Sequence, residues 1–229
     1  MRFVWALLMI VLPSRLRRVL GRRVLGWDVH PTAYIGRSVI LVPKVTLGPG
    51  SSIGPMNVIK DIEELRLGDG AIIGSRNWIT GFPLGSVHFP HSPNRYPALI
   101  LGDHAMVTVA HEIDCTDRVE LATYATLAGF RCQVLTHSLN LVKDRQETSP
   151  VELGERCAVM TGCTILSGTR IPRRAIISAG SVVTTKLNRE QAFYRGNPAE
   201  VVRDLPDTLR YFHRGEASPA DVLSDADLG

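Results

Sequence analysis

Cysteine is scarce in this chain of 229 residues, and the motifs that mark several other classes of protein are missing. The four cysteines form no Cys-x-x-Cys pair and lie at Cys115, Cys132, Cys157 and Cys163. This sparse set excludes a dense disulfide framework and favours a reducing, cytoplasmic setting. No glycine-rich strand–turn–helix motif of the dinucleotide or P-loop type is present, which excludes those two kinds of nucleotide site.

Acidic residues are absent from the first 26 positions, which instead hold six arginines. Because the formal charge of the whole chain is +4, this segment contributes +6 and the other 203 residues sum to −2. The basic character therefore belongs to the N-terminal segment, and a nucleic-acid partner is not expected. The overall composition, 45% hydrophobic and 21% charged, is typical of a globular protein with a core.

The longest apolar run, residues 3–12, is too short to span a bilayer, which takes about 20 apolar residues. Five arginines follow it, and basic flanks of this kind stay on the cytoplasmic side. We expect residues 1–26 to form an amphipathic basic helix. Two placements remain open: peripheral contact with anionic lipid on the inner face of the plasma membrane, or packing against the rest of the protein or an oligomer partner.

A six-residue repeat of aliphatic side chains extends from residue 29 to residue 183. Its first run is Val29, Ile35, Leu41, Leu47, Ile53 and Ile59, and its last is Leu153, Val159, Ile165, Ile171, Ile177 and Val183. A period of six fits neither a helix nor a plain strand, but it is the signature of a solenoid of short strands with one hexad on each side of a triangular prism. The repeated aliphatics are expected to point inward and to stack between successive coils.

Two stretches interrupt the repeat and are expected to be excursion loops. They are residues 80–99, which carry four prolines, and residues 138–150. Long loops inside a regular scaffold are more often functional than accidental. After Pro198 we expect a short helix, and residues 204–229 then form a C-terminal helix and a flexible acidic tail.

From residue 27 to residue 203 the sequence resembles the hexapeptide-repeat acyltransferases, in particular the sugar O-acetyltransferases among them. The most specific segments are ILSGTRIPRRAIISAGSVVTTKL (165–187), RGNPAEVVRDL (195–205) and QVLTHSL (133–139). The resemblance implies an all-β fold, a left-handed parallel β-helix, and a homotrimer with active sites in the clefts between neighbouring prisms. It also implies acetyl-CoA as the acyl donor. No metal is expected, because the histidines are not spaced as a ligand set.

His137 matches the catalytic histidine of this family and is the expected general base, since an imidazole titrates near working pH. A carboxylate commonly orients such a base. Asp117 precedes His137 by 20 residues, which is one coil plus a two-residue slip, and is the expected partner. Glu120 and Asp114 are alternatives.

The resemblance places the acyl donor along the C-terminal coils. The cofactor-binding residues that it implies are Thr161, Gly162, Ala179, Thr184, Lys186 and Arg203. Among them, Lys186 and Arg203 are expected to face phosphates.

The acceptor is expected to be a sugar or a glycan precursor, and its expected contacts are His111, His88, His91 and Tyr96. The function predicted from the sequence is therefore transfer of an acetyl group from acetyl-CoA to a hydroxyl of such an acceptor. Two alternatives remain: a small-molecule acetyltransferase for a free sugar or xenobiotic, and a non-acyltransferase β-helix such as a carbonic-anhydrase-like protein. The seven histidines show no close pair downstream on the coils that would support a zinc site.

Overall fold

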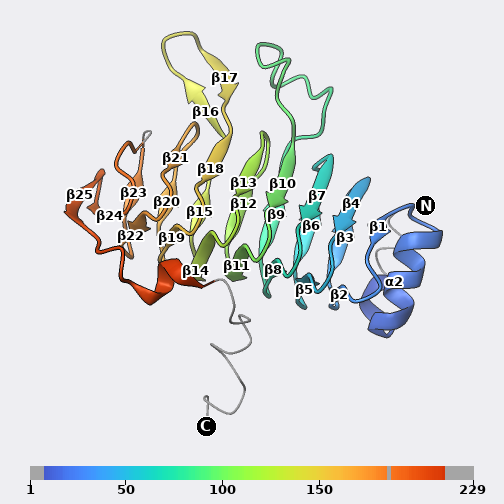
Figure 1. Cartoon of the computed structure of the whole chain (residues 1–229). Coiled ribbons are helices and arrows are strands. Elements are labelled where there is room, and N and C mark those ends of the chain that lie inside the picture. The colour runs from blue at the N-terminus through green and yellow to red at the C-terminus, as the bar shows by residue number, and fades with distance from the viewer. Residues whose placement is uncertain (1–7, 185–186, 215–229) are drawn as a thin grey trace.

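A computed structural model describes residues 8–184 and 187–214 and confirms the predicted parallel β-helix. Successive short strands pass to three parallel sheets in turn, so that three strands make one coil (Figure 1). The first sheet contains β1 (Asp28–Val29), β4 (Lys44–Leu47), β7 (Glu64–Leu67), β10 (Ala98–Leu101), β13 (Val119–Leu121), β18 (Val151–Leu153) and β21 (Arg170–Ile171).

The other two sheets are also parallel from coil to coil, except that the last pair of the second sheet, β24 and β25, is antiparallel. The second sheet contains β2 (Tyr34–Ile35), β5 (Ser52–Ile53), β8 (Ile72–Ile73), β11 (Met106–Val109), β14 (Thr126–Phe130), β19 (Ala158–Val159), β22 (Ile176–Ile177), β24 (Ala192–Gly196) and β25 (Ala199–Asp204). The third sheet contains β3 (Val39–Leu41), β6 (Val58–Lys60), β9 (Trp78–Thr80), β12 (Glu112–Asp114), β15 (Gln133–Val134), β20 (Thr164–Ile165) and β23 (Val182–Val183).

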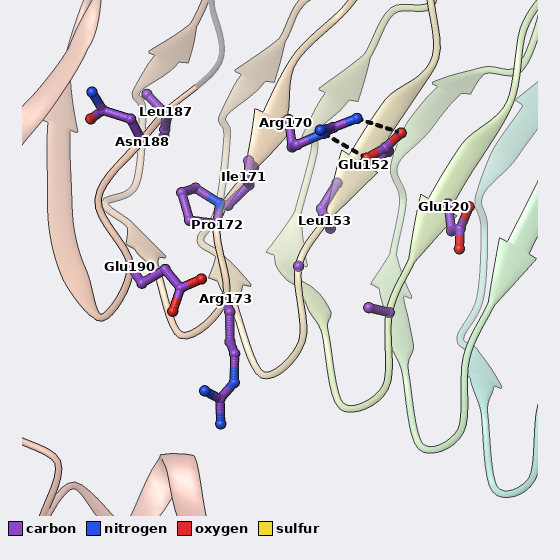
Figure 2. Close-up of a pocket in the computed structure, with 12 residues that line it drawn as sticks. Glu120, Glu152, Leu153, Arg170, Ile171, Pro172, Arg173, Leu187, Asn188 and Glu190 are labelled. Atoms are coloured by element: carbon purple, nitrogen blue, oxygen red, sulfur yellow. Dashed lines mark hydrogen bonds and ion pairs between the residues drawn. The ribbon is translucent and has the colours of Figure 1, made fainter.

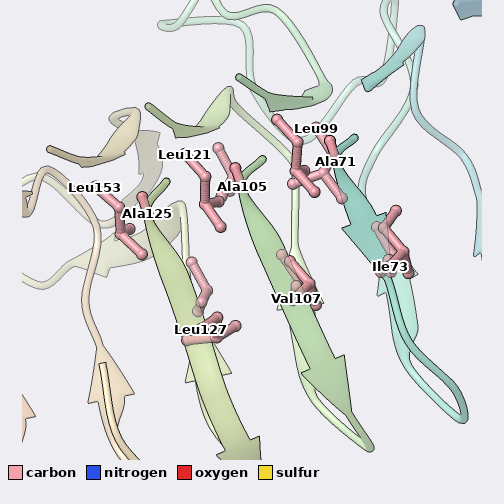
Figure 3. Close-up of a cluster of buried hydrophobic side chains, with 14 of the residues drawn as sticks. Ala71, Ile73, Leu99, Ala105, Val107, Leu121, Ala125, Leu127 and Leu153 are labelled. Atoms are coloured by element: carbon pink, nitrogen blue, oxygen red, sulfur yellow. The ribbon is translucent and has the colours of Figure 1, made fainter. Parts of the chain in front are cut away.

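The core is a set of aliphatic columns that run along the axis of the prism. Ile73, Val107 and Leu127 stack in the second sheet, each 1% exposed or less, because parallel pairing brings equivalent residues of successive coils together (Figure 3). Burial of one such side chain contributes about 2 kcal/mol. In β3 the inward residue is Ile40 rather than the predicted Leu41, since the inward position there follows Ile35 by five residues instead of six.

The corner between the second and third sheets begins with stacked glycines in the first three coils, Gly36, Gly54 and Gly74. A Cβ atom on Gly54 would overlap the carbonyl oxygen of Gly74 in the next coil. The absence of a side chain therefore lets the carbonyls of one coil approach the next closely.

The helix α2 (Ser14–Arg23) covers the N-terminal end of the prism (Figure 1). Arg17 is buried and donates to the carbonyl oxygen of Ile35 at 2.7 Å, while Arg18 donates to that of Ala33 at 3.1 Å. For residues 14–23 the structure thus shows packing on the β-helix, although Leu16 and Val19 remain half exposed. In the part of the chain that the structure describes, no helix is long and apolar enough to cross a membrane.

The prediction of a helix directly after Pro198 is wrong. Residues 199–204 form β25, which pairs antiparallel with β24, because the turn at Asn197–Pro198 folds the chain back on itself. The helical segment that follows is one 3-10 turn, η1 (Arg210–His213), whose Phe212 is buried. The tail predicted at 215–229 and the predicted cofactor residue Lys186 lie outside the described residues.

Both excursions leave the prism at the corner between the third and first sheets and project on the same side (Figure 1). The first, residues 81–97, follows β9. The second is a hairpin rather than a plain loop, with β16 (His137–Asn140) paired antiparallel to β17 (Arg145–Thr148). The excursions meet where the backbone N–H of Thr148 donates to Ser92 Oγ at 3.3 Å.

Candidate active site

His137 begins the hairpin at the point where the chain leaves the third sheet, and it is paired with a carboxylate. Its Nδ1 lies 2.7 Å from Oδ2 of Asp114, the last residue of β12 in the preceding coil. The imidazole is about a third exposed, with 31% of its side-chain area accessible. Among the described residues, no hydrogen bond engages Nε2. The second ring nitrogen therefore remains open to a substrate.

Asp114 is held by four further donors. Its Oδ1 accepts hydrogen bonds from the backbone N–H of Thr116 at 3.0 Å and the hydroxyl of Thr116 at 2.5 Å, and its Oδ2 from the N–H and hydroxyl of Thr136 at 2.8 and 2.9 Å. Burial alone would raise the pKa of Asp114, but the hydrogen bonds from His137, Thr116 and Thr136 outweigh it and lower the pKa to about 2. Asp114 is thus a fixed anion at working pH.

The pKa of His137 is raised, first because Asp114 accepts its hydrogen bond, and against a smaller effect of burial. Two aromatic rings from the first excursion also confine the imidazole. Phe82 and Phe89 each meet it edge to face, with ring centroids 5.8 Å apart. The site is therefore an oriented, partly shielded histidine whose charged form is stabilised by a carboxylate, which suits a general base.

Asp117 does not contact His137, which corrects the predicted pairing. Its Oδ2 accepts from the hydroxyl of Thr148 at 3.0 Å, and its Oδ1 accepts from the N–H of Tyr96 at 3.2 Å. In a regular part of the repeat, outward residues of successive sheets, such as Arg170 and Ile176, are six residues apart. The corner after β12 is wider than this, and it therefore turns Asp117 toward the excursions. The buried Asp117 thus ties both excursions to the coil.

The first excursion is fixed by a buried arginine that sequence reasoning missed. Arg95 is 7% exposed and donates to the carbonyl oxygens of Phe82 at 2.6 Å, Pro83 at 2.5 Å and Thr116 at 3.1 Å. Its guanidinium also lies 5.0 Å from the ring centre of Phe89. These contacts set both aromatic rings against His137, and no local sequence pattern marks Arg95 for the task.

His111, predicted to contact the acceptor, is instead an internal corner residue. It is fully buried; Nδ1 accepts from the N–H of Cys132 at 3.1 Å and Nε2 lies 2.9 Å from the hydroxyl of Thr108. Burial lowers the pKa of His111 to about 4, so the ring is neutral. A histidine with both nitrogens used by the protein has none left for a substrate.

The predicted acceptor residues of the first excursion divide between two places. His88 is exposed and contacts Phe82 at 5.5 Å between ring centroids, on the side chain that also meets His137. His91 and Tyr96 line a separate hollow of about 400 Å³ with Asp117 and Thr148. The Tyr96 hydroxyl there donates to Glu64 at 3.0 Å.

The predicted donor-binding residues are only partly brought together. Thr161 and Gly162 lie at the corner between the second and third sheets, and Ala179 lies directly above them, where the N–H of Gly180 donates to the carbonyl of Thr161 at 2.9 Å. Thr184 is exposed at the far end of β23.

The last predicted donor residue, Arg203, is on β25, with its guanidinium 5.6 Å from the ring centre of Phe193. In this chain the Thr161–Ala179 corner lies where the strands of the third sheet begin, and His137 lies where they end.

A further hollow of about 460 Å³ lies on the first sheet at the C-terminal coils (Figure 2). Both arginines that line it are paired, because Arg170 binds Glu152 at 2.7 Å and Arg173 lies 3.5 Å from Glu155. For the residues described here, no three His, Cys, Asp or Glu side chains gather into a group that could hold a metal ion.

No protein-family model matches the sequence, and a search of curated proteins finds no relative. Solved structures do match. A hexapeptide-repeat-containing acetyltransferase of Vibrio cholerae is 16% identical, with 90% of this chain and 89% of that chain covered and a TM-score of 0.51. A variant of AntD, an N-acyltransferase of Bacillus cereus, in complex with dTDP-4-amino-4,6-dideoxyglucose and coenzyme A, is 13% identical, covers 76% and 88%, and has a TM-score of 0.59.

At these identities the likeness establishes the fold. The chain has the hexapeptide-repeat β-helix that its sequence predicted, and the resemblance to this class is confirmed at that level.

Proposed function

We propose that this protein is an acyl-CoA-dependent O-acetyltransferase that transfers an acetyl group from acetyl-CoA to a hydroxyl of a sugar or glycan precursor. The observation that carries the proposal is the Asp114–His137 pair, 2.7 Å apart, at the base of two excursions. The fold, shared with an acetyltransferase and an N-acyltransferase, supports it. A fold hosts many functions, so the argument rests on the site.

His137 acts as the general base through Nε2. It takes the proton of the acceptor hydroxyl while the hydroxyl oxygen attacks the carbonyl carbon of the thioester. The imidazolium that forms is stabilised by Asp114 and then gives its proton to the sulfur of the departing coenzyme A. The proton is thus returned within one turnover, and no covalent enzyme intermediate is needed.

The donor is proposed to lie along the corner that carries Thr161, Gly162 and Ala179, with Thr184, Lys186 and Arg203 toward its phosphates. Since that corner and His137 are at opposite ends of the strands of the third sheet, we propose that the corner of one protomer faces His137 of the next in a homotrimer. Small residues at the corner would let a pantetheine arm approach the backbone closely.

The acceptor is proposed to approach His137 beside Phe82 and His88 of the first excursion. The enzyme is proposed to work in the cytoplasm, peripherally on the inner face of the plasma membrane. The half-exposed Leu16 and Val19 of α2, together with the arginines of the N-terminal segment, support that placement.

The direct test is calorimetric titration of the protein with acetyl-CoA, beside a His137→Ala variant. We expect micromolar binding by both proteins, because His137 contacts the reacting atoms and not the length of the donor. A thiol-release assay with acceptor should then show a rate for His137→Ala lower by a factor of about 10² to 10⁴. Absence of binding at millimolar acetyl-CoA would refute the acetyltransferase.

A further inference from the structure

A hollow of about 450 Å³ lies on the outer face of the third sheet, and the Asp114–His137 pair is not among the residues that line it, although the buried His111 is. It spans three successive coils, and one strand of each contributes an outward side chain to its floor: Trp78 from β9, Glu112 from β12 and Gln133 from β15. The parallel register sets these three residues side by side. Arg76 and Arg131 stand at its rim.

In the single chain the indole of Trp78, which lines the hollow, is 51% exposed, and a large aromatic ring left in solvent is available to a ligand. Such a ring offers a flat apolar face with one N–H donor. That combination suits the C–H face of a pyranose, which is apolar on one side and carries hydroxyls around its edge. The hollow therefore has a platform for one sugar ring.

The rim is positively charged. Arg76 and Arg131 are both exposed, and neither guanidinium forms an ion pair or a side-chain hydrogen bond with a residue that the structure describes. The one carboxylate in the hollow, Glu112, accepts a hydrogen bond from Gln133 at 3.0 Å. Two guanidinium groups against one carboxylate favour an anionic group on the ligand, which arginine binds in a bidentate manner.

The position of the two arginines is fixed by the backbone. Both have a left-handed conformation, with φ near 60°, at equivalent corners of their coils. The N–H of Arg131 donates to the carbonyl of Ala110 at 3.2 Å, and the N–H of Ala110 donates to that of Ser75 at 2.9 Å. Backbone hydrogen bonds thus connect this corner from coil to coil, and one coil lies between the two arginines.

The hollow leads to the catalytic pair along a strand. Glu112 and Asp114 are both on the outer face of β12, two residues apart, which is about 7 Å at the rise of a strand. In the register between β9 and β12, Trp78 is paired with Glu112 and Thr80 is paired with Asp114. A saccharide seated on Trp78 thus reaches toward His137 with its neighbouring hydroxyl or its next residue.

We infer that this hollow is a subsite for an anionic saccharide, one that carries a phosphate or a carboxylate, with Trp78 under the ring and Arg76 and Arg131 on the charge. The inference deepens the proposed function and rests on it, since it names the class of acceptor. It differs from the sequence-based expectation by moving the acceptor contacts from the first excursion to the third sheet. The predicted contact His111 lines the hollow, but both of its ring nitrogens are hydrogen-bonded within the protein.

The test uses the fluorescence of Trp78 in the full-length protein without acetyl-CoA, titrated with glucose 1-phosphate, glucuronic acid and glucose. We expect one or both charged sugars to change the emission and glucose to bind at least tenfold more weakly. The two charged probes distinguish phosphate from carboxylate as the recognised group. Trp78→Phe should abolish the signal, which assigns it to this residue.

Arg76→Ala and Arg131→Ala should each weaken binding of the charged sugar about tenfold, the usual effect of losing one charge-assisted contact. Arg37→Ala is the matched control, since Arg37 is exposed at the same corner but two coils away, outside the hollow. Equal binding of glucose, no binding of any probe, an equal loss with Arg37→Ala, or displacement of the sugar by coenzyme A would each overturn the inference.

The two proposals fail separately. If acetyl-CoA does not bind while glucose 1-phosphate or glucuronic acid does, the acetyltransferase is wrong and the saccharide subsite stands. If acetyl-CoA binds and the charged sugars do not, the subsite is wrong and the acetyltransferase stands.

Discussion

At the scale of single residues, the chemistry depends on which carboxylate faces His137. Asp114 raises the pKa of that imidazole by accepting its Nδ1 hydrogen bond. The amide in Asp114→Asn lacks the charge that stabilises the imidazolium, so the pKa of His137 falls toward its ordinary value. The base is therefore neutral down to a lower pH, but it is less effective in the transition state.

For Asp114→Asn we expect the acid limb of the pH profile of kcat/KM to move to lower pH and the plateau to fall about tenfold or more. The measurement is the rate of coenzyme A release between pH 5 and 9. Glu120→Gln is the control, because Glu120 pairs with Arg118 at 3.3 Å on the first sheet and not with His137. A plateau lowered equally by both variants, with no shift of the acid limb, would contradict the assignment.

His111 predicts a second pH effect, on stability. Its pKa is about 4 in the folded protein, because burial disfavours the charged ring, against about 6.5 in the unfolded chain. A lowered folded-state pKa means that its contribution is complete above pH 6.5 and is lost as the pH falls toward 4. The loss from this group alone is about 3 kcal/mol.

Urea unfolding at a series of pH values measures this loss, and His111→Gln should remove most of the slope between pH 6.5 and 4. His137 has the opposite sign, since its raised pKa adds stability below pH 6.5 that is lost as the pH rises through the folded value. A wild-type curve that is flat or rises on acidification in this window would contradict the role of His111.

The residue scale also shows what the sequence predicts and what it does not. His137 is found from its segment, and Asp114 was one of three candidate carboxylates. Which carboxylate faces His137 depends on where the extra residues of the wide corner are inserted. A shift of one residue along the chain turns a side chain to another face. The first excursion brings three further residues to the site: Arg95, Phe82 and Phe89. Because the excursion does not follow the six-residue repeat, its path cannot be predicted from the sequence pattern.

At the scale of elements, the corners are where the repeat is least tolerant. A side chain at Gly54 meets the backbone carbonyl of Gly74, and backbone cannot move aside as a side chain can. We expect Gly54→Ala to destabilise the fold by about 3 kcal/mol, as for severe overpacking. The measurement is the midpoint of urea unfolding.

Gly50→Ala is the matched control for this prediction. Gly50 has φ of +66° and no atom nearer than 4.0 Å to its missing Cβ, so only the left-handed backbone is strained. That cost is about 1 kcal/mol. If the two variants lose equal stability, close approach of the coils is not what requires glycine at Gly54.

The positions of the strands can be predicted from the sequence, because each inward aliphatic side chain packs against the equivalent side chains of the coils before and after it. Among the strands of the coils, two departures occur at the ends of the repeat, where a neighbour is missing on one side. In β3, close to α2, Ile40 replaces Leu41 as the inward residue, and after β24 the chain reverses into β25. Residues 138–150 were expected as a loop, and their hairpin depends on pairing within the excursion rather than on the coil.

At the scale of the whole molecule, the proposed trimer predicts sharing of sites between protomers. An Ala179→Trp variant blocks the donor corner, and His137→Ala removes the base. Each homogeneous trimer should be inactive. Trimers reassembled from the two variants should recover up to about a quarter of wild-type activity, because some clefts then join two intact halves.

Size-exclusion chromatography with light scattering provides the control for assembly in this experiment. A mixture of the two variants that forms trimers and stays inactive would place both halves of the site in one protomer. A monomeric wild-type protein with full activity would do the same.

The N-terminal segment predicts binding to anionic membranes, since Leu16 and Val19 are exposed beside arginines on α2. In vesicle sedimentation we expect binding to phosphatidylglycerol-containing vesicles that weakens with salt, and little binding to phosphatidylcholine alone. Leu16→Ser with Val19→Ser should reduce it several-fold, whereas Val142→Ser, at an exposed position between β16 and β17, should not. Equal binding of all three proteins would exclude this face as the contact.

The helix α2 has one more consequence, for association of the chain with itself. Arg17 donates to the carbonyl oxygen of Ile35, which is in β2, the first strand of the second sheet. Arg18 donates to that of Ala33, just before β2. Without them, the first coil would present unpaired strands, a template on which another prism adds end to end. Deletion of residues 1–26 should therefore yield associated, polydisperse protein rather than a smaller monodisperse one, because α2 caps the first coil.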